Sequence, residues 1–307
     1  MTIVADYAWM DCPGDTTAKA GVDPHAAVAA GVGIVVLRGQ VCYFDAKHDS
    51  WIIQRDPVAE RDAQAWRDAG AVVMEYMFPG LGHGRPGMAQ QVATFASTSK
   101  VLPGVDLPPG LDIEFPGRGI VDTHQTQAEV GDDVVESVNQ LVLSFGLPPF
   151  IYTSHVQMHD TNGLGGVLAG SAELAACPLW DKVPYPVGAG KPPQLNLARP
   201  PHDGSVSWDR GDLWRYPSPW NAAWMLQEQG DVRGFAGLPQ ADIGVFVNLS
   251  PANPRDARWP AVAKKLGITG ELTASSLAAG VQNFQSDHGL VADGIIGPRT
   301  FVQLAWL

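Results

Sequence analysis

Two acidic residues stand close together in an apolar stretch, GLDIEFP at 110–116. A strand directs successive side chains to opposite faces, so Asp112 and Glu114 would share one face and the apolar residues the other. The solvated outer face of an antiparallel sheet would explain such a pattern without any chemistry. Loop signals flank the segment, PPG before it and PGRG after it, which places the acids where a strand runs into a loop.

Two carboxylates at this spacing suit one kind of reaction. Side chains two residues apart on a strand lie about 6 to 7 Å from each other. The carboxyl group in the more apolar surroundings can be held protonated while its neighbour stays charged. Cleavage of a glycosidic bond needs that combination: an acid for the leaving oxygen and an anion beside the positively charged sugar ring.

The elements that must position these acids alternate along the chain. Residues 56–70 read as a helix, with Asp56 as N-cap and Gly70 as the stop. Short apolar runs predict strands at 31–39, 71–80 and 149–154, and a second helix is predicted at 128–146. This alternation indicates parallel strands with crossover helices, in an α/β barrel or a doubly wound sheet. In both architectures the chemistry gathers at the carboxyl ends of the strands.

Composition limits the function further. The chain has 307 residues, 45% of them hydrophobic, which is enough for a large core and about one to three domains. A formal charge of −12 argues against nucleic-acid binding, which requires a basic surface. The N-terminus lacks the pattern of a secretion signal, and no apolar run of about 18 residues predicts membrane insertion. The three cysteines are widely separated and fit reduced thiols without a catalytic role.

Two further motifs predict no cofactor or metal. GLGHGRPG at 80–87 follows a strand as a nucleotide loop would, but Pro86 and the lack of a phosphate-binding helix start favour a plain loop. His155 and His159 could share a helical face, but no third ligand stands at metal spacing. We therefore expect no cofactor and no metal.

Several short motifs together resemble the family 25 glycoside hydrolases. In chain order they are IVADY, VVLRG, YMF, LDIE, FIYTS, PLWDK, WMLQEQG and ADIGVF, spread over about residues 1–250. The resemblance implies a lysozyme that acts as an N-acetylmuramidase on peptidoglycan through an irregular (β/α) TIM-like barrel. Gly244 stands where the family usually has an asparagine, and residues 183–218 look longer and richer in proline than the usual connection.

Carried over to this sequence, the family's site consists of Asp6, Asp112, Glu114 and Asp242, with Glu114 as general acid. Asp112 or Asp242 would act as a nucleophile or would orient the N-acetyl group of the substrate, and the sequence leaves these roles open.

Six other residues are predicted to bind substrate. Aromatic rings can stack on sugar rings, although core packing is the more frequent role for any single one of them. The arginine could instead form a structural ion pair. The six residues are Arg38, Tyr76, Tyr152, Trp180, Trp224 and Gln227.

The end of the chain differs in character. Residues 250–259 read as a linker between a catalytic domain at 1–249 and a small all-α helical module at 260–307. The run VQNFQSDHGLVADGIIGP resembles the type 1 peptidoglycan-binding domain. Within the module, Thr273 can cap one helix and Pro298 can open another. The loop between them is expected to need positive φ at three glycines, Gly289, Gly294 and Gly297.

The two resemblances point to one polymer. They imply a modular phage endolysin, expected to be a monomer, whose partners are peptidoglycan glycan strands and which is held in the host cytoplasm until release to the cell wall. The alternative is a non-catalytic wall-binding protein with a degenerate barrel. A chitinase-type hydrolase is disfavoured because its longer acid motif, DxxDxDxE, is missing from the sequence.

Overall fold

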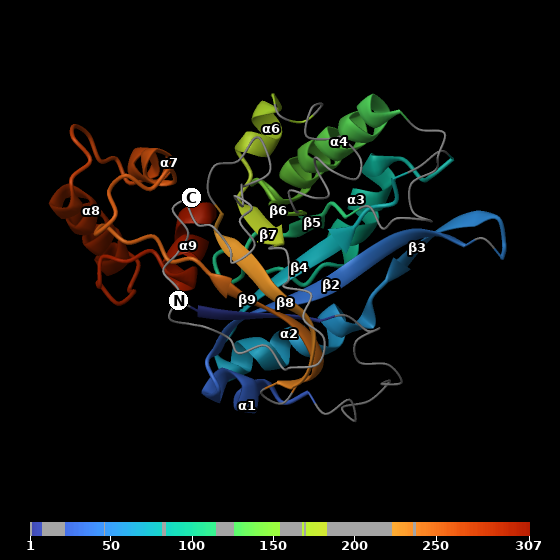
Figure 1. Cartoon of the computed structure of the whole chain (residues 1–307), viewed down its shortest axis with the longest axis horizontal. Helices are drawn as coiled ribbons and strands as arrows, with labels where there is room; N and C mark the ends of the chain where they lie inside the picture. The colour runs from blue at the N-terminus through green and yellow to red at the C-terminus, as the bar shows by residue number, and fades with distance from the viewer. Residues whose placement is uncertain are drawn as a thin grey trace, which may run out of the picture.

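The structure, a computed structural model, describes most of the chain as an α/β barrel followed by three helices (Figure 1). The described residues are 2–7, 22–45, 47–81, 84–114, 126–153, 168, 170–182, 223–235 and 238–307. The strands are β1 Thr2–Tyr7, β2 Val32–Asp45, β3 Ser50–Arg55, β4 Val72–Phe78, β5 Gly110–Asp112, β6 Phe150–Thr153, β7 Leu179–Lys182, β8 Met225–Phe235 and β9 Leu238–Phe246. The helices are α1 Pro24–Ala29, α2 Pro57–Ala69, α3 Met88–Thr98, α4 Gln127–Phe145, α6 Ala172–Ala175, α7 Trp259–Lys265, α8 Ala274–Asp287 and α9 Pro298–Ala305.

The sheet closes on itself. Its strand order is β1-β9-β8-β7-β6-β5-β4-β2-β3, and β1 also pairs with β2. The strands from β4 to β8 pair in parallel, as does β1 with β2, whereas β9 is antiparallel to both of its neighbours. Of the two architectures open from the sequence, the barrel is therefore correct, and β3 is an antiparallel addition outside the closed ring.

Local sequence explains where the helices begin and end. Asp56 accepts a hydrogen bond from Val58 N, and Gly70 ends α2 in the left-handed conformation, with φ of 98°. Both were predicted. Thr273 caps α8 and Pro298 opens α9, also as predicted.

One expectation about the glycines of the last loop is wrong. Gly289 and Gly294 have φ of 66° and 74°, but Gly297 has φ of −89°. Gly297 is the N-cap of α9, and an extended N-cap does not need the left-handed conformation.

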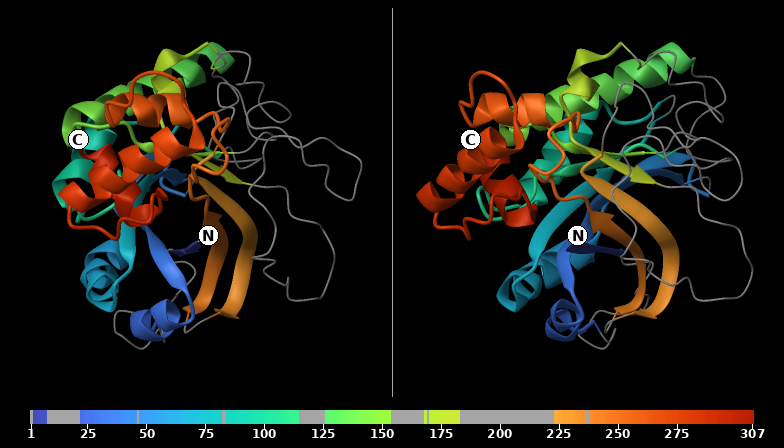
Figure 2. Two further views of the ribbon diagram at one scale, coloured as in Figure 1. Left: turned by 90° about the vertical axis from the view of Figure 1, so that its left-hand side faces the viewer. Right: turned by 60° about the vertical axis from the view of Figure 1, so that its left-hand side comes forward.

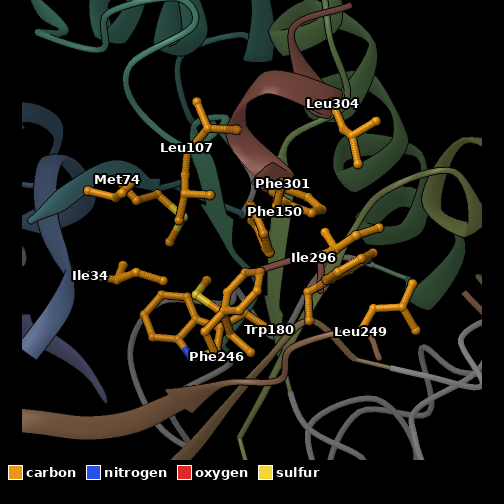
Figure 3. Close-up of a cluster of buried hydrophobic side chains, with 14 of the residues drawn as sticks. Ile34, Met74, Leu107, Phe150, Trp180, Phe246, Leu249, Ile296, Phe301 and Leu304 are labelled. Carbon is orange, nitrogen blue, oxygen red and sulfur yellow. The ribbon is translucent and has the colours of Figure 1, made fainter. Parts of the chain in front are cut away.

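The core has one layer inside the barrel and others between the sheet and its helices. One outer cluster packs α3 and α4 against the sheet, and another packs α1 and α2 against it. The inner cluster contains Val4, Ile34 and Trp180 from the strands and continues without a break into residues of α7, α8 and α9. Figure 3 shows Ile34 and Trp180 in one cluster with Phe301 and Leu304 of α9. The interior of the barrel and the core of the C-terminal helices are thus one hydrophobic unit.

Phe301 of α9 is the centre of this junction. Its ring lies 4.5 Å from Trp224, 5.4 Å from Phe150 and 5.8 Å from Phe246, measured between centroids (Figure 3). Phe150 and Trp224 lie at the amino ends of β6 and β8, so α9 covers the amino end of the barrel. With the left-hand side of Figure 1 turned toward the viewer, the three C-terminal helices stand in front of the sheet (Figure 2).

Polar contacts fix the same junction. Trp306 Nε1 donates to the Asp106 carbonyl at 2.7 Å, and Gln303 Nε2 donates to the Gly104 carbonyl at 2.7 Å. Arg258, just before α7, donates to the carbonyls of Ala223 and Val247 and lies 4.6 Å from the centre of the Trp224 ring. These bonds hold the helices in one orientation on the barrel.

We expect Phe301→Ala to destabilise the whole chain by about 3 to 5 kcal/mol, because it removes a buried ring from the cluster that joins barrel and helices. Urea unfolding followed by near-ultraviolet circular dichroism measures the change. Leu143→Ala is the matched control, since Leu143 is an exposed residue of α4. An equal effect of the two substitutions would contradict a shared core.

Candidate active site

Asp112 faces the inside of the barrel. Leu111 and Ile113 belong to the outer cluster beneath α3 and α4, so Asp112 points the other way, into the ring of strands. Its side chain is only 6% exposed. The explanation by a solvated outer face is therefore wrong. Glu114 follows on the same side, two residues beyond the end of β5, and is partly exposed.

A second acidic pair forms on the other side of the barrel. Asp6 of β1 and Asp242 of β9 are direct partners in the antiparallel register. Opposed side chains in such a pair have Cβ atoms about 4.5 to 5.5 Å apart. Val4, two residues from Asp6, and Phe246, four residues from Asp242, belong to the cluster inside the barrel. Residues an even number of positions apart on a strand share a face, so the acids also face inward. Residues far apart in the sequence are thereby brought together as a concentration of negative charge.

All four acids lie at the same end of the barrel. Asp6, Asp112 and Glu114 lie at or just beyond the carboxyl ends of their strands, and Asp242 lies at the level of Asp6 because the two are paired. Asp112 is the last residue of β5, and Asp6 is the last but one of β1. This is the end of a barrel where catalytic residues usually gather. The opposite end is covered by α9.

Aromatic rings line the interior beside Asp112. In the parallel register, Asp112 pairs with Tyr152, and Tyr152 pairs with Trp180. The Trp180 ring lies 4.5 Å from the Tyr152 ring and 6.4 Å from the Tyr76 ring. Gly110 leaves the space for this arrangement, because a Cβ there would come within 2.7 Å of the Tyr76 Cβ. All three rings are largely buried, and Trp180 Nε1 has no hydrogen-bond partner in the described part of the chain.

Arg38 contacts an acid outside the group of four. It pairs with Asp56 at 2.9 Å, and Asp56 also caps α2. Burial disfavours the charged guanidinium, but Tyr76, Asp56 and Asp6 favour it, and together they raise the pKa of Arg38 above its usual value. Arg38 therefore stays charged, and its ion pair with Asp56 connects β2 to the start of α2.

Of the predicted substrate-binding residues, Trp224 lies apart from the acids. Trp224 lies at the amino end of β8, where it contacts Phe301 and Arg258, so it does not join the acids. Gln227 lies on β8 opposite Gly244, and its side chain is outside the description. His155, His159 and the whole 183–218 segment also fall outside the described residues. Among the described residues, no group of three or more His, Cys, Asp or Glu side chains could hold a metal ion.

Sequence reasoning missed two buried acids on the outer side of the sheet. Asp181 of β7 is fully buried, neither of its carboxylate oxygens has a hydrogen-bond partner among the described residues, and burial raises its pKa well above the usual value. Glu75 of β4 accepts a hydrogen bond from Lys100 N at 2.8 Å, and burial raises its pKa to about 7. Both alternate with inward-facing aromatic residues. The sequence signal that could have identified them is a single acidic residue within an apolar strand, in VVMEYMF for Glu75 and in LWDK for Asp181.

Cys42 and Cys177 are buried free thiols. Burial raises the pKa of Cys42 to about 11 and that of Cys177 to about 12. Neither thiol is therefore ionised at neutral pH, and neither is activated as a nucleophile. None of the described helices has the length and apolar character needed to span a bilayer.

Comparison with solved structures finds the same fold in other proteins. A muramidase from Trichobolus zukalii matches with a TM-score of 0.56 at 16% identity, over 80% of this chain and 93% of its own. A lysozyme from Streptomyces coelicolor matches with a TM-score of 0.57 at 14% identity, over 80% and 91%. A family 25 lysozyme from Aspergillus fumigatus matches with a TM-score of 0.56 at 16% identity, over 80% and 93%.

The barrel has the fold of the family 25 lysozymes. Residues 267–304 separately match the family model described as a putative peptidoglycan binding domain. This range covers α8 and all of α9 except its last residue, Ala305. No curated protein matches the sequence.

We expect Glu75→Gln to reduce the dependence of stability on pH. The folded chain binds the Glu75 proton up to about pH 7, whereas the unfolded chain releases it near the usual pKa of 4.5. The folded state therefore holds more protons between these values, and stability falls as pH rises from 4.5 to 7, by about 3 kcal/mol in total.

Urea unfolding at pH 5, 6, 7 and 8 measures this dependence. The variant should be more stable than the wild-type protein at pH 8 and should lose less stability between pH 5 and 8. Glu136→Gln, at an exposed acid of α4, is the control. Parallel curves for Glu75→Gln and wild type would show that the buried carboxyl does not set the pH dependence.

Proposed function

We propose that this protein hydrolyses bacterial peptidoglycan as an N-acetylmuramidase, cutting the β-1,4 bond between N-acetylmuramic acid and N-acetylglucosamine. The observation that carries the proposal is the set of inward-facing acids at one end of the barrel, Asp6, Asp112, Glu114 and Asp242. The shared fold with muramidases and the match of residues 267–304 to a peptidoglycan-binding domain support the same substrate.

Glu114 is the proposed general acid. It is partly exposed and lies beyond the end of its strand, where it can reach a bound glycan and donate a proton to the leaving oxygen. Asp112 is buried beside it, and the pair Asp6 and Asp242 adds negative charge across the barrel. These carboxylates stabilise the positive charge that develops on the sugar ring. The negative charge of these carboxylates is compatible with two routes: attack by one of the carboxylates on the sugar, and participation of the substrate's own N-acetyl group.

The aromatic residues have a supporting part in this proposal. Tyr76, Tyr152 and Trp180 pack together beside Asp112 inside the barrel and support the position of that acid. Arg38 supports the rim near Asp6, and Gln227 stays a prediction. Trp224 has no part in substrate binding here, because it packs against the C-terminal helices.

We also propose that residues 1–249 are the catalytic domain and that residues 260–307 hold the protein on the cell wall. The match to the peptidoglycan-binding domain lies within the second range. The role as a phage endolysin, released from a host cytoplasm, stays a prediction of the sequence.

Glu114→Gln should reduce turnover of purified peptidoglycan by at least ~10²-fold, because the amide keeps the shape of the side chain but cannot donate the acid proton. The release of soluble fragments gives the rate, and thermal unfolding checks that the variant is folded. Asp132→Asn, at an exposed acid of α4, is the control and should keep full activity.

Near-normal turnover of Glu114→Gln would contradict the assignment of the general acid. If the wild-type protein bound peptidoglycan without releasing fragments, the non-catalytic wall-binding alternative would be favoured instead.

A further inference from the structure

The β2–β3 hairpin extends beyond the barrel on the side of the proposed active site. β2 pairs with β1 only as far as Leu37 and with β4 only as far as Val41, and residues 42–45 pair with β3 alone. At about 3.3 Å per residue, four residues project roughly 13 Å past the rim. In Figure 1 this hairpin reaches away from α7, α8 and α9, at the other end of the long axis.

A groove of about 500 Å³ lies between this hairpin and the loop that precedes α3. We call it the hairpin groove. Its lining includes Phe44, Asp49, Trp51, Arg85, Pro86 and Gln90. Nothing in the proposed catalytic mechanism uses these residues.

Two aromatic rings form one wall of the hairpin groove. Phe44 and Trp51 are cross-strand partners, their centroids lie 5.7 Å apart and the rings meet edge to face. Phe44 is 37% exposed, which is unusual for a large apolar side chain on a strand. Trp51 packs against Gly80, where a Cβ would come within 2.8 Å of the indole ring. The glycine therefore lets Trp51 rest directly on the backbone.

The opposite wall is held by hydrogen bonds. The Gln91 side chain is buried, accepts from Gly80 N at 2.9 Å and donates to the carbonyls of Gly80 and Pro86. Arg85 forms a double hydrogen-bonded ion pair with Asp133 of α4. This side of the groove is therefore already in place before any ligand binds, which lowers the free-energy cost of binding.

The charged residues that line the hairpin groove favour a neutral ligand. The cation in the lining, Arg85, is already paired with Asp133. Asp49 adds a negative charge to the lining. An anionic polymer would meet no unpaired cation among the lining residues. A sugar ring, in contrast, offers an apolar face for the aromatic wall and hydroxyl and amide groups for Gln90 and Asp49.

We propose that the hairpin groove is a second glycan-binding site, which takes a neutral amino sugar of a glycan strand at a distance from the bond that is cut. The proposal rests on the proposed function, since it names a further contact for the same substrate. It requires that long glycan strands gain affinity from this site and that short ones do not reach it.

The test compares peptide-free glycan strands of two lengths, a tetrasaccharide and a mixture of long strands, as substrates for wild type and Phe44→Ala. The variant should raise KM for long strands by about three- to tenfold, in line with the loss of one aromatic contact, and leave KM and kcat for the short substrate unchanged. Phe44→Tyr keeps a ring and should behave as wild type. Val105→Ala, at an exposed apolar residue away from the groove, controls for general surface effects.

Binding of long strands to the same variants, measured by calorimetry, keeps the two proposals separate. Weaker binding by Phe44→Ala supports the groove even if the wild-type protein cuts no glycan. Unchanged binding and KM would overturn the groove, and so would an equal change for both substrate lengths. An effect seen only with strands that carry peptides would also overturn it, because the groove would then bind peptide.

Discussion

The hydrogen bonds on the two edges of β1 hold the site together. One edge pairs in parallel with β2 and the other antiparallel with β9, which closes the sheet into a barrel. The same pairing sets Asp6 opposite Asp242, and the closed ring carries both toward the side of Asp112 and Glu114. A shift of one residue in this register would turn Asp6 out of the barrel, because strand side chains alternate between faces. The geometry of the acids therefore depends on the closure of the sheet.

The second constraint is the packing of α9 over the amino end of the barrel. A barrel whose interior is packed needs its open ends covered, and here Phe301 and its neighbours cover one of them. The acids lie toward the other end, where the hairpin also projects. In the proposed function, the wall-binding helices and the place of cleavage are thus on opposite ends of one packed unit. The enzyme would bind the wall on one side and cut strands that approach from the other.

Local features were predictable from the sequence because they depend on near neighbours. The caps at Asp56 and Thr273 and the stop at Gly70 follow from side chains within a few residues. The alternation of Asp112 with Leu111 and Ile113 also gave the correct faces, although not which face was inside. The C-terminal match was visible because its glycines and polar residues fall in one short run.

Contacts between distant segments could not be predicted in this way. The register of Asp6 with Asp242 depends on β9, and the packing of Phe301 on Trp224 depends on how the ends of the chain meet. The strand expected at 31–39 runs on to Asp45 and turns back as β3, because residues past the rim gain their pairing from a strand that the pattern did not reveal.

Mass spectrometry of fragments released from purified peptidoglycan tests the central claim most directly. The account predicts new reducing ends on N-acetylmuramic acid, and release of free peptides with intact glycan strands would contradict it.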